Sequence, residues 1–451
     1  MARARGNRRA GGGGGGSLVD RRLRRWLTKE MREVAPLVAA GAAACAADRY
    51  RKHFTARQHT WLLLFHGLTR QPSLRQSYAA FAQCDGLLAA SGLAAPAPAA
   101  AAAVRLGVSY SQFAASNTSR PPAFLAALFA AVLQRVRRGA RADPLAPPPE
   151  LCLLDATFFR GCLRLAPWAP TMRGRRRRAA VRVQVEYTPA QDLPEHVLVQ
   201  RGQPNDCRGL DAAILDHPDR LAELEGRTLI FDLGFYSHAR FARLLAAGVH
   251  LVTRLHPQAA VTVLEQRPLP QPFPGLPAGR IALEADQHIR LGSAHNRRGA
   301  VLPDLRLVTA TVAPTPVAAR HGAHPVRYRV LTDRWDRTPQ EVVQFYLWRW
   351  LIESFFRWLK RVVNAVHLLG ESPEATELSV WLALVVHLLC LLAAQALDQP
   401  GRSPALLAQF PVLFGALTPD ELAAATDHPP PPIQLPLPDL LPTRPTDLPC
   451  S

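Results

Sequence analysis

Lysine is almost missing from this sequence. Of the 54 basic residues, only Lys29, Lys52 and Lys360 are lysines, and every other one is an arginine. Alanine, proline and glycine are abundant, as expected of a gene from a GC-rich genome, so a high arginine content carries little functional information by itself. The lysine retained at position 360 therefore needs an explanation of its own.

Cysteine pairs with metal-binding spacing are missing as well. The seven cysteines are scattered, with no CxxC pair and no histidine nearby at zinc-finger spacing. An odd, unpatterned set of cysteines indicates a reducing compartment and argues against a zinc module. The first residues, MARARGNRRAGGGGGG, contain no apolar stretch, so we expect no secretion signal.

Acidic residues are too few to balance the basic ones. The chain has 35 acidic and 54 basic residues, which gives a net charge of +19. This excess favours a polyanionic partner, and nucleic acid over a membrane surface. One apolar run, residues 378–397, approaches the length of a transmembrane helix, but Ser379, His387 and Gln395 interrupt it. We therefore predict a buried core helix there, and no membrane partner.

The N-terminal part of the chain is expected to be helical. Residues 1–19 form a basic, glycine-rich tail that predicts disorder, and residues 20–144 carry the apolar stripes of several helices. The segment LRLGVSYSQFAASNTSRPP fits a helix–turn–helix that contacts DNA, and it fits a structural helical hairpin equally well. We predict a helical N-terminal DNA-binding domain over residues 20–144.

The pattern changes at PLAPPPE, residues 144–150. Strands and helices alternate over residues 145–256, which indicates an α/β domain with a mixed sheet. Residues 257–326 are proline-rich with short strand-like pieces and predict a β-rich insertion. The α/β domain resumes over residues 327–398, and residues 399–451 form a C-terminal segment with a proline-rich tail.

One long helix is predicted to follow Thr338. This residue is a good N-cap, Pro339 suits the first turn, and Glu341 occupies the acidic position of a capping box. At about 100° per residue, apolar residues cover much of one side. A narrow stripe on the other side holds one phenol, one carboxylate and three cations: Tyr346, Arg349, Glu353, Arg357 and Lys360.

A solvated, salt-bridged face is the usual explanation of such a stripe. A lone carboxylate between cations, flanked by aromatic residues, better fits a metal ligand beside phosphate-binding groups. Two aspartates support this, because Asp155 follows the apolar run LCLL and Asp232 ends the buried strand LIFD. For either aspartate alone, a turn or N-cap role is the simpler explanation, but both together with Glu353 point to a metal site. Magnesium or manganese takes such hard oxygen ligands, and a pair of ions about 3.5–4 Å apart can catalyse phosphoryl transfer.

The spacing Tyr346-x2-Arg349-x3-Glu353-x6-Lys360 resembles the YREK signature of the insertion-sequence-four family of DDE transposases. The segments LLDAT, LIFDLGFYSHARF and VLTDRWDRTPQEVVQFYLW occur in the family's order, and the similarity spans roughly residues 150–400. This resemblance implies an RNase H-like catalytic domain, interrupted by the β-rich insertion. It also implies that Asp155, Asp232 and Glu353 are the catalytic, metal-binding triad, and that Tyr346, Arg349 and Lys360 contact transposon-end phosphates.

The resemblance further implies a bacterial, cytoplasmic, nucleoid-associated enzyme that binds about two magnesium or manganese ions. The enzyme would cleave the ends of its insertion sequence and join the freed 3′-hydroxyl to target DNA. Its partners would be transposon-end DNA and target DNA, on which it would act as a dimer. A nuclease that cuts without joining, and a transposase-derived DNA-binding protein with a dead site, are the alternatives.

Further cations are expected to hold DNA. Arg357 lies in the helical stripe, and the cluster RGRRRR between two predicted strands supplies Arg173, Arg175, Arg176, Arg177 and Arg178. As a solvated hairpin loop this cluster needs no role, but beside a DNA-holding domain phosphate contact is favoured, with a strong salt dependence. Lys360 differs from these arginines because lysine is a compact, mobile point charge, whereas arginine is a rigid planar fork. A site shaped for lysine would explain why lysine was retained.

Overall fold

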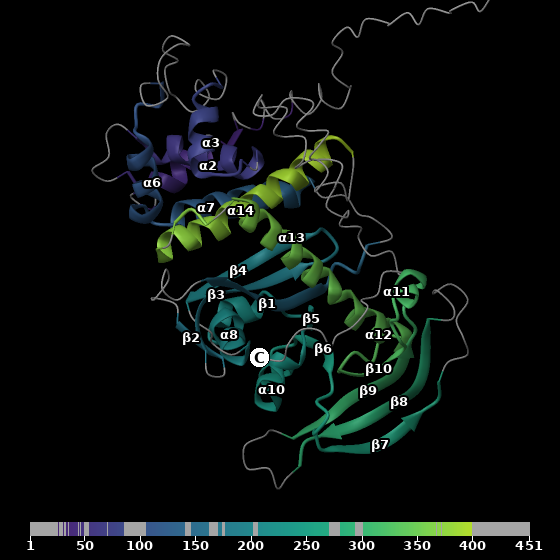
Figure 1. Ribbon diagram of the computed structural model, residues 1–451. Helices are drawn as coiled ribbons and strands as arrows, with labels where there is room; N and C mark the ends of the chain where they lie inside the picture. The colour runs from purple at the N-terminus through teal and green to yellow at the C-terminus, as the bar shows by residue number, and fades with distance from the viewer. Residues whose placement is uncertain are drawn as a thin grey trace, which may run out of the picture.

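A computed structural model of the protein describes most of the chain between residues 54 and 398 (Figure 1). The described ranges are 54–69, 71–84, 105–139, 146–161, 170–173, 176–201, 206–269, 280–293, 301–366, 368–370 and 372–398, with scattered positions between 26 and 48. The predicted tail (1–19), the segment 399–451, Lys29, Lys52 and Arg175 lie outside these residues.

A ten-stranded mixed sheet forms the centre of the molecule, which confirms the predicted α/β class. The strand order is β2-β3-β1-β5-β6-β10-β9-β8-β7, and β4 pairs with β3. Only β1, β5 and β6 are parallel neighbours, and the remaining pairings are antiparallel. The strands are β1 Leu151–Gly161, β2 Pro170–Arg173, β3 Arg176–Thr188, β4 Leu193–Arg201, β5 Thr228–Ile230, β6 His250–Arg254, β7 Val261–Arg267, β8 Ile281–Leu291, β9 Leu302–Val312 and β10 Val326–Thr332.

The parallel strands are buried on both faces. Successive side chains of a strand point to opposite faces, and here both sets are apolar. Leu153 and Ile230 belong to the core on one face of the sheet, and Leu154 and Phe231 belong to the core on the other. This double burial explains why the sequence of β1 and β5 reads as continuous apolar runs.

The predicted insertion extends the same sheet. Residues 257–326 contain β7, β8, β9 and the short helix α11, Pro316–Arg320. Strand β10 pairs with β9 over its whole length and with β6 at its C-terminal end, so the sheet runs on without interruption (Figure 1). Because β10 begins at Val326, the predicted boundary at residue 326 falls at the first residue of this strand.

Short helices cover the second core. After β4 come α8, Asp206–Leu210, a π-helix, Asp211–Leu215, and α9, Pro218–Ala222. A 3-10 helix, Leu233–Phe235, and α10, His238–Ala246, follow β5. Phe241 and Leu244 of α10 pack beside Phe231 in this core, which fixes the segment that follows β5.

The long apolar helix is α14, Pro373–Ala396, which by length and composition could cross a membrane, but 83% of its most apolar window is buried inside the protein. It packs against three N-terminal helices, α2 (Ala56–Thr69), α6 (Tyr110–Ser119) and α7 (Ala123–Gly139), and also against α13 (Trp350–Val366) and β4. Its polar residues bond within the protein: Ser379 donates to the Ala375 carbonyl, Gln395 donates to the Val136 carbonyl, and His387 contacts the Asp192 carbonyl. As predicted, this run is a core helix.

The N-terminal helices share a core with the α/β part of the chain. Phe124, Leu128 and Val132 of α7 belong to the same hydrophobic cluster as α14 and the face of the sheet that contains Leu153. Helix α3, Leu74–Phe81, contributes Phe81 to it. The helices predicted for residues 20–144 are therefore packed onto the α/β part, and their described portion has no separate core.

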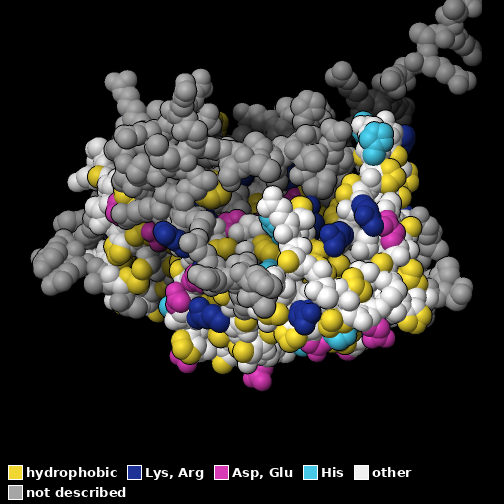
Figure 2. Space-filling view, turned by 90° about the horizontal axis from the view of Figure 1, so that it is seen from below, with side chains coloured by type: hydrophobic (Ala, Val, Ile, Leu, Met, Phe, Trp, Pro, Cys, Tyr) yellow, Lys and Arg dark blue, Asp and Glu magenta, His cyan; other side chains and the backbone are white. Residues whose placement is uncertain are grey.

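On the face seen in Figure 2, the described lysine and arginine side chains are spread among acidic and apolar ones and do not form one large patch. Many described arginines are paired with carboxylates, among them Arg182 with Asp206 and Arg227 with Glu195. Residues 1–25, by contrast, contain eight arginines and a single acid. Much of the net charge therefore belongs to segments outside the described body.

Candidate active site

The register of the parallel strands brings the two predicted aspartates together. Leu153 of β1 pairs with Ile230 of β5, which pairs with Val252 of β6. Two positions further, just past the paired stretch, the row consists of one polar residue from each strand: Asp155, Asp232 and Arg254. In α/β sheets, ligands bind at this carboxyl end of parallel strands.

Asp155 projects from β1 and is 22% exposed. One of its oxygens accepts a hydrogen bond from the Ala156 amide, with an N–O distance of 2.7 Å. Burial raises the pKa of Asp155 to about 7, and the nearby Glu353 and Asp232 carboxylates add to this rise, while Arg349 opposes it. The nearby Arg349 therefore does not offset the effect of burial on this carboxyl.

Asp232 has a turn role and a site role at once. As the N-cap of the 3-10 helix it accepts a hydrogen bond from the Leu233 amide at 2.8 Å. The same oxygen accepts from Nη2 and Nε of Arg254, at 2.9 and 3.2 Å, and from the Tyr346 hydroxyl at 3.2 Å. Although burial acts to raise it, Arg349 and Arg254 hold the pKa of Asp232 below its ordinary value.

The helix that carries the stripe is broken, contrary to the prediction of one continuous helix. It forms α12, Pro339–Trp348, and α13, Trp350–Val366, separated by a turn at Arg349. The Arg349 amide bonds to the Tyr346 carbonyl at 3.1 Å, a spacing of three residues instead of four. Glu353 consequently lies in the first turn of α13.

Arg349 contacts all three carboxylates. Its guanidinium lies 2.5 Å from Oε1 of Glu353, 3.8 Å from Oδ2 of Asp155 and 4.0 Å from Oδ2 of Asp232. Burial raises the pKa of Glu353, whereas its ion pair with Arg349 acts in the opposite direction. Three acids from three different elements thus converge on one partly buried cation.

Tyr346 is buried beneath this cluster. Its side chain is 4% exposed, and burial raises the pKa of the phenol well above its ordinary value. The hydroxyl therefore stays protonated and acts as a hydrogen-bond donor, here to Asp232. The predicted contact of Tyr346 with a DNA phosphate stays a prediction.

Arg357 and Lys360 lie further along α13. Arg357 is exposed, and its guanidinium stacks on the Trp350 ring at 4.7 Å from the centroid. Lys360 is partly buried on the same helix. Opposite them, the buried face of α12 and α13 holds the apolar residues Phe345, Ile352, Phe355 and Leu359, as the periodicity predicts.

The arginine cluster lies at the hairpin between β2 and β3. Arg173 of β2 pairs with Arg176 of β3, and Met172 pairs with Arg177. Three arginines predicted for a loop, Arg176, Arg177 and Arg178, therefore belong to a strand, because β3 starts earlier than its apolar residues indicate. The contact of this cluster with DNA stays a prediction.

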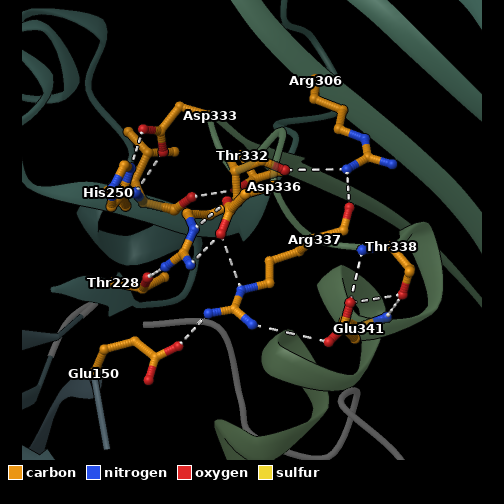
Figure 3. A network of polar contacts seen from close by, with 12 residues as sticks. Glu150, Thr228, His250, Arg306, Thr332, Asp333, Asp336, Arg337, Thr338 and Glu341 are labelled. Carbon is orange, nitrogen blue, oxygen red and sulfur yellow. Dashed lines mark hydrogen bonds and ion pairs between the residues drawn. The ribbon is translucent and has the colours of Figure 1, made fainter. Parts of the chain in front are cut away.

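A polar network holds the start of α12 at the opposite edge of the parallel strands (Figure 3). Arg334 binds both oxygens of Asp336 at 2.8 Å and also donates to Thr228 of β5. Arg337 donates to Glu150, just before β1, at 2.7 Å. From this fixed start, α12 crosses the sheet and delivers Tyr346 and Arg349 to the carboxylates.

The capping box predicted for this helix is present. The Thr338 side chain accepts a hydrogen bond from the Glu341 amide, while the Glu341 carboxylate accepts from the Thr338 amide at 2.7 Å. Arg306 of β9 adds hydrogen bonds to the carbonyls of Arg334 and Arg337, which ties the segment to the insertion.

The carboxylates fit a hard divalent cation by their chemistry. Asp155, Asp232 and Glu353 supply only oxygen donors, and magnesium and manganese prefer such donors. In the described part of the chain, no three Asp, Glu, His or Cys side chains are grouped closely enough to enclose an ion as they stand. The triad carboxylates instead face Arg349, so a bound ion would compete with this guanidinium.

Arg254 is a site residue that we did not predict from the sequence. It ends β6, in the register position that places it next to Asp232. The sequence does show an arginine at the end of a buried strand, which could have marked Arg254 as a candidate. Recognising that it lies beside Asp232 requires the strand order, because the two residues are 22 positions apart in the chain.

Comparison with known proteins agrees with this geometry. The family model described as the transposase DDE domain matches residues 146–389, which is more than half of the chain. A candidate transposase named y4zB, from Sinorhizobium fredii, is 25% identical over 287 residues, 62% of this chain and 70% of that protein. The transposase assigned to insertion sequence element IS5377 of Geobacillus stearothermophilus is 22% identical over 262 residues, 58% of this chain and 61% of that protein. The chain therefore belongs to the DDE transposase family.

Proposed function

We propose that this protein is the transposase of a bacterial insertion sequence, of the YREK type, and that Asp155, Asp232 and Glu353 are its metal-binding triad. It cleaves the ends of its element and joins the freed 3′-hydroxyl to target DNA. The observation that carries this proposal is the convergence of three carboxylates, from β1, the end of β5 and α13, on the single cation Arg349.

The sheet supports an RNase H-like catalytic domain. The order β4-β3-β1-β5-β6 combines an antiparallel β1–β3–β4 meander with parallel β1, β5 and β6. The first two acids lie side by side on adjacent parallel strands, and the third comes from a helix after the insertion. This arrangement places all three at one edge of the sheet, where a DNA backbone can reach them.

Each residue of the site has a definable task. Ions held by the triad would activate the attacking oxygen and stabilise the leaving one. Arg254 fixes the orientation of Asp232, and the neutral Tyr346 phenol donates to the same carboxylate. Burial keeps the Tyr346 phenol protonated, which makes it a poor nucleophile. The proposal therefore assigns nucleophilic attack to water and to the 3′-hydroxyl, without a covalent protein intermediate.

The cations beyond the triad are assigned to DNA. Arg349 lies beside the triad at the turn between α12 and α13, and Arg357 and Lys360 follow along α13. We assign these three cations to transposon-end phosphates. Arg173 and Arg175–Arg178 at the β2–β3 hairpin, and the N-terminal helices, would hold flanking DNA, which predicts binding that weakens steeply with salt. A dimer on DNA follows from the resemblance to the YREK family.

A cleavage and joining assay tests this function. The purified protein is incubated with magnesium and DNA that spans the ends of its element, beside Asp232→Asn and, as a matched control, Asp211→Asn. Asp211 is also an aspartate paired with an arginine, Arg240, but it lies in the π-helix away from the triad. We expect cleavage at the element boundary by the parent and Asp211→Asn, and none by Asp232→Asn.

The joining step separates the proposal from its alternatives. Insertion of the cut end into a supercoiled target plasmid supports a transposase, whereas cutting without joining identifies a nuclease. Specific binding to the ends without any cutting identifies a DNA-binding protein with a dead site.

A further inference from the structure

We infer that Arg349 is an exchangeable counter-charge, which leaves the triad for a DNA phosphate and so makes end DNA and a divalent ion strengthen each other's binding. This inference rests on the proposed function. The proposed function names the residues that bind the ion. The inference adds the condition under which they can bind it, namely that Arg349 has moved to DNA.

The contacts of Arg349 are of the kind that can be exchanged. Its short ion pair is with Glu353, four residues on in the chain, and its distances to Asp155 and Asp232 lie near the limit of an ion pair, at 3.8 and 4.0 Å. Among the described residues, its Nε has no hydrogen-bond partner. The guanidinium is therefore held closely at one point, by Glu353, and only weakly by Asp155 and Asp232. The ion pairs of the described residues include no two-pronged bond between Arg349 and any of the three acids.

Arg254 shows what a fixed arginine looks like at the same site. It comes from the middle of the sheet and directs Nε and Nη2 at one oxygen of Asp232, at 3.2 and 2.9 Å. Arg349 instead sits at the turn between two helices, where a change of side-chain rotamer does not disturb a strand. Arg254 can thus keep Asp232 oriented when Arg349 turns away.

Arg349 has two alternative positions, at the triad or at a DNA phosphate, and electrostatics link the choice between them to the bound ligands. If Asp155, Asp232 and Glu353 held a divalent ion, their oxygens would no longer be free to pair with Arg349, and the guanidinium would be repelled by the positive charge. A DNA phosphate beside the triad offers the guanidinium a new anionic partner, with which arginine forms bidentate bonds. Each ligand therefore removes a cost of binding the other, and the coupling must be reciprocal.

The size of the coupling is measurable. Coupling free energies between sites usually change affinity by about 5- to 150-fold. We expect the affinity of the triad for manganese to rise roughly tenfold on saturation with end DNA, within that range. Because manganese is paramagnetic, free ion can be counted from its electron paramagnetic resonance signal, without reference to activity.

The experiment titrates manganese into the full-length protein, alone and saturated with a duplex that already ends at the cleaved element boundary. Four proteins are compared: the parent, Arg349→Gln, Asp232→Asn and Arg240→Gln. Asp232→Asn identifies the ions that the triad binds. Arg240→Gln removes one arginine from an aspartate pair away from the triad, and so controls for the loss of charge alone.

The inference predicts a tenfold gain with DNA for the parent and for Arg240→Gln. Arg349→Gln should bind manganese tightly without DNA and gain little from it, because the competing cation has been removed. If Arg349→Gln does not fold, Arg349→Lys serves instead, with a coupling that differs from that of the parent.

Two results would overturn the inference and leave the proposed function intact: equal manganese affinity of the parent with and without DNA, or an undiminished gain in Arg349→Gln and Arg349→Lys. If no manganese binding depends on Asp232 under any condition, the triad assignment itself is wrong, and both proposals fail.

Discussion

Two clusters of arginine and acid lie at opposite edges of the same parallel strands, connected by α12. At the edge where α12 begins, arginines lie at hydrogen-bond distance from carboxylates: Arg334 binds Asp336 at 2.8 Å, and Arg337 lies 2.7 Å from Glu150 and 3.2 Å from Asp336. At the edge where α12 ends, three carboxylates share Arg349, which lies 3.8 Å from Asp155 and 4.0 Å from Asp232; among the described residues, only Asp232 is paired with a second arginine. The side chains are of the same kinds, but their pairing differs.

The difference indicates what each cluster does. A cluster whose carboxylates are held by short contacts to arginine fixes geometry and has little left to bind. In the second cluster, the described cation paired with Asp155 lies 3.8 Å away, and burial raises the pKa of this carboxyl; groups with a perturbed pKa often mark functional sites. The first cluster positions α12, and the second is open to a ligand.

Replacing a glutamate by glutamine at each end of the parallel strands, Glu353 at one and Glu341 at the other, should give the largest difference between the two clusters. Glu353→Gln should lower DNA cleavage by at least about 10³-fold, because the proposal makes Glu353 a metal ligand, and losing such a ligand costs several kcal/mol of catalysis. Glu341→Gln should leave cleavage nearly unchanged, since an amide oxygen can still accept the capping hydrogen bond. Cleavage rates at element ends give the measurement, with DNA binding as the control. Equal effects of the two variants would remove the distinction between the edges.

The polar network at the start of α12, to which Arg306 belongs, is expected to stabilise the fold. Arg306 binds both oxygens of Asp286 at 2.8 Å, and both side chains are almost fully buried. Arg306→Gln leaves the buried Asp286 charge uncompensated and should lower the free energy of unfolding by about 3 kcal/mol. Urea denaturation measures it. Arg327→Gln, which breaks the exposed ion pair of Arg327 with Glu284, serves as the control. If Arg306→Gln lowers the free energy of unfolding by less than Arg327→Gln does, the buried pair has no structural role.

Lys360 tests whether the open edge needs a point charge. If lysine was retained for its compact ammonium, Lys360→Arg should reduce cleavage on the order of tenfold, equivalent to one charged hydrogen bond. Arg361→Lys, the reverse exchange at the exposed neighbour, serves as control and should have little effect. Full activity of Lys360→Arg would refute our explanation of the retained lysine.

The smallest effect is expected at Thr338, the N-cap of α12. Thr338→Ala removes the N-cap of α12 and should cost about 1 kcal/mol of stability. Because the polar network still holds the segment, cleavage by the folded enzyme should stay close to that of the parent. Thermal unfolding and a cleavage assay at low temperature separate these two effects. A large loss of cleavage in the folded variant would show that the cap itself positions the site.

Sequence patterns were sufficient for the local features. The apolar runs predicted β1 and β5, the capping signals predicted the start of α12 at Thr338, and the apolar periodicity predicted its buried face. Asp155 and Asp232 were selected because an acid beside a buried strand is costly. Each of these inferences uses neighbours within a few residues.

The remaining features depend on residues that are far apart in the sequence. Arg254 approaches Asp232 only because β5 and β6 are adjacent, and Arg337 approaches Glu150 across 187 positions. The break at Arg349 also has no proline or glycine to announce it. Periodicity describes one element at a time, so it cannot supply these contacts.

The central claim, that the open edge is a metal-dependent DNA site, is tested most directly by a structure of the protein with its element-end DNA and manganese, using anomalous scattering to locate the ions. Our account predicts anomalous density between Asp155, Asp232 and Glu353, with the Arg349 guanidinium on a phosphate. Ions bound elsewhere, with Arg349 still among the three carboxylates and the DNA away from them, would contradict it.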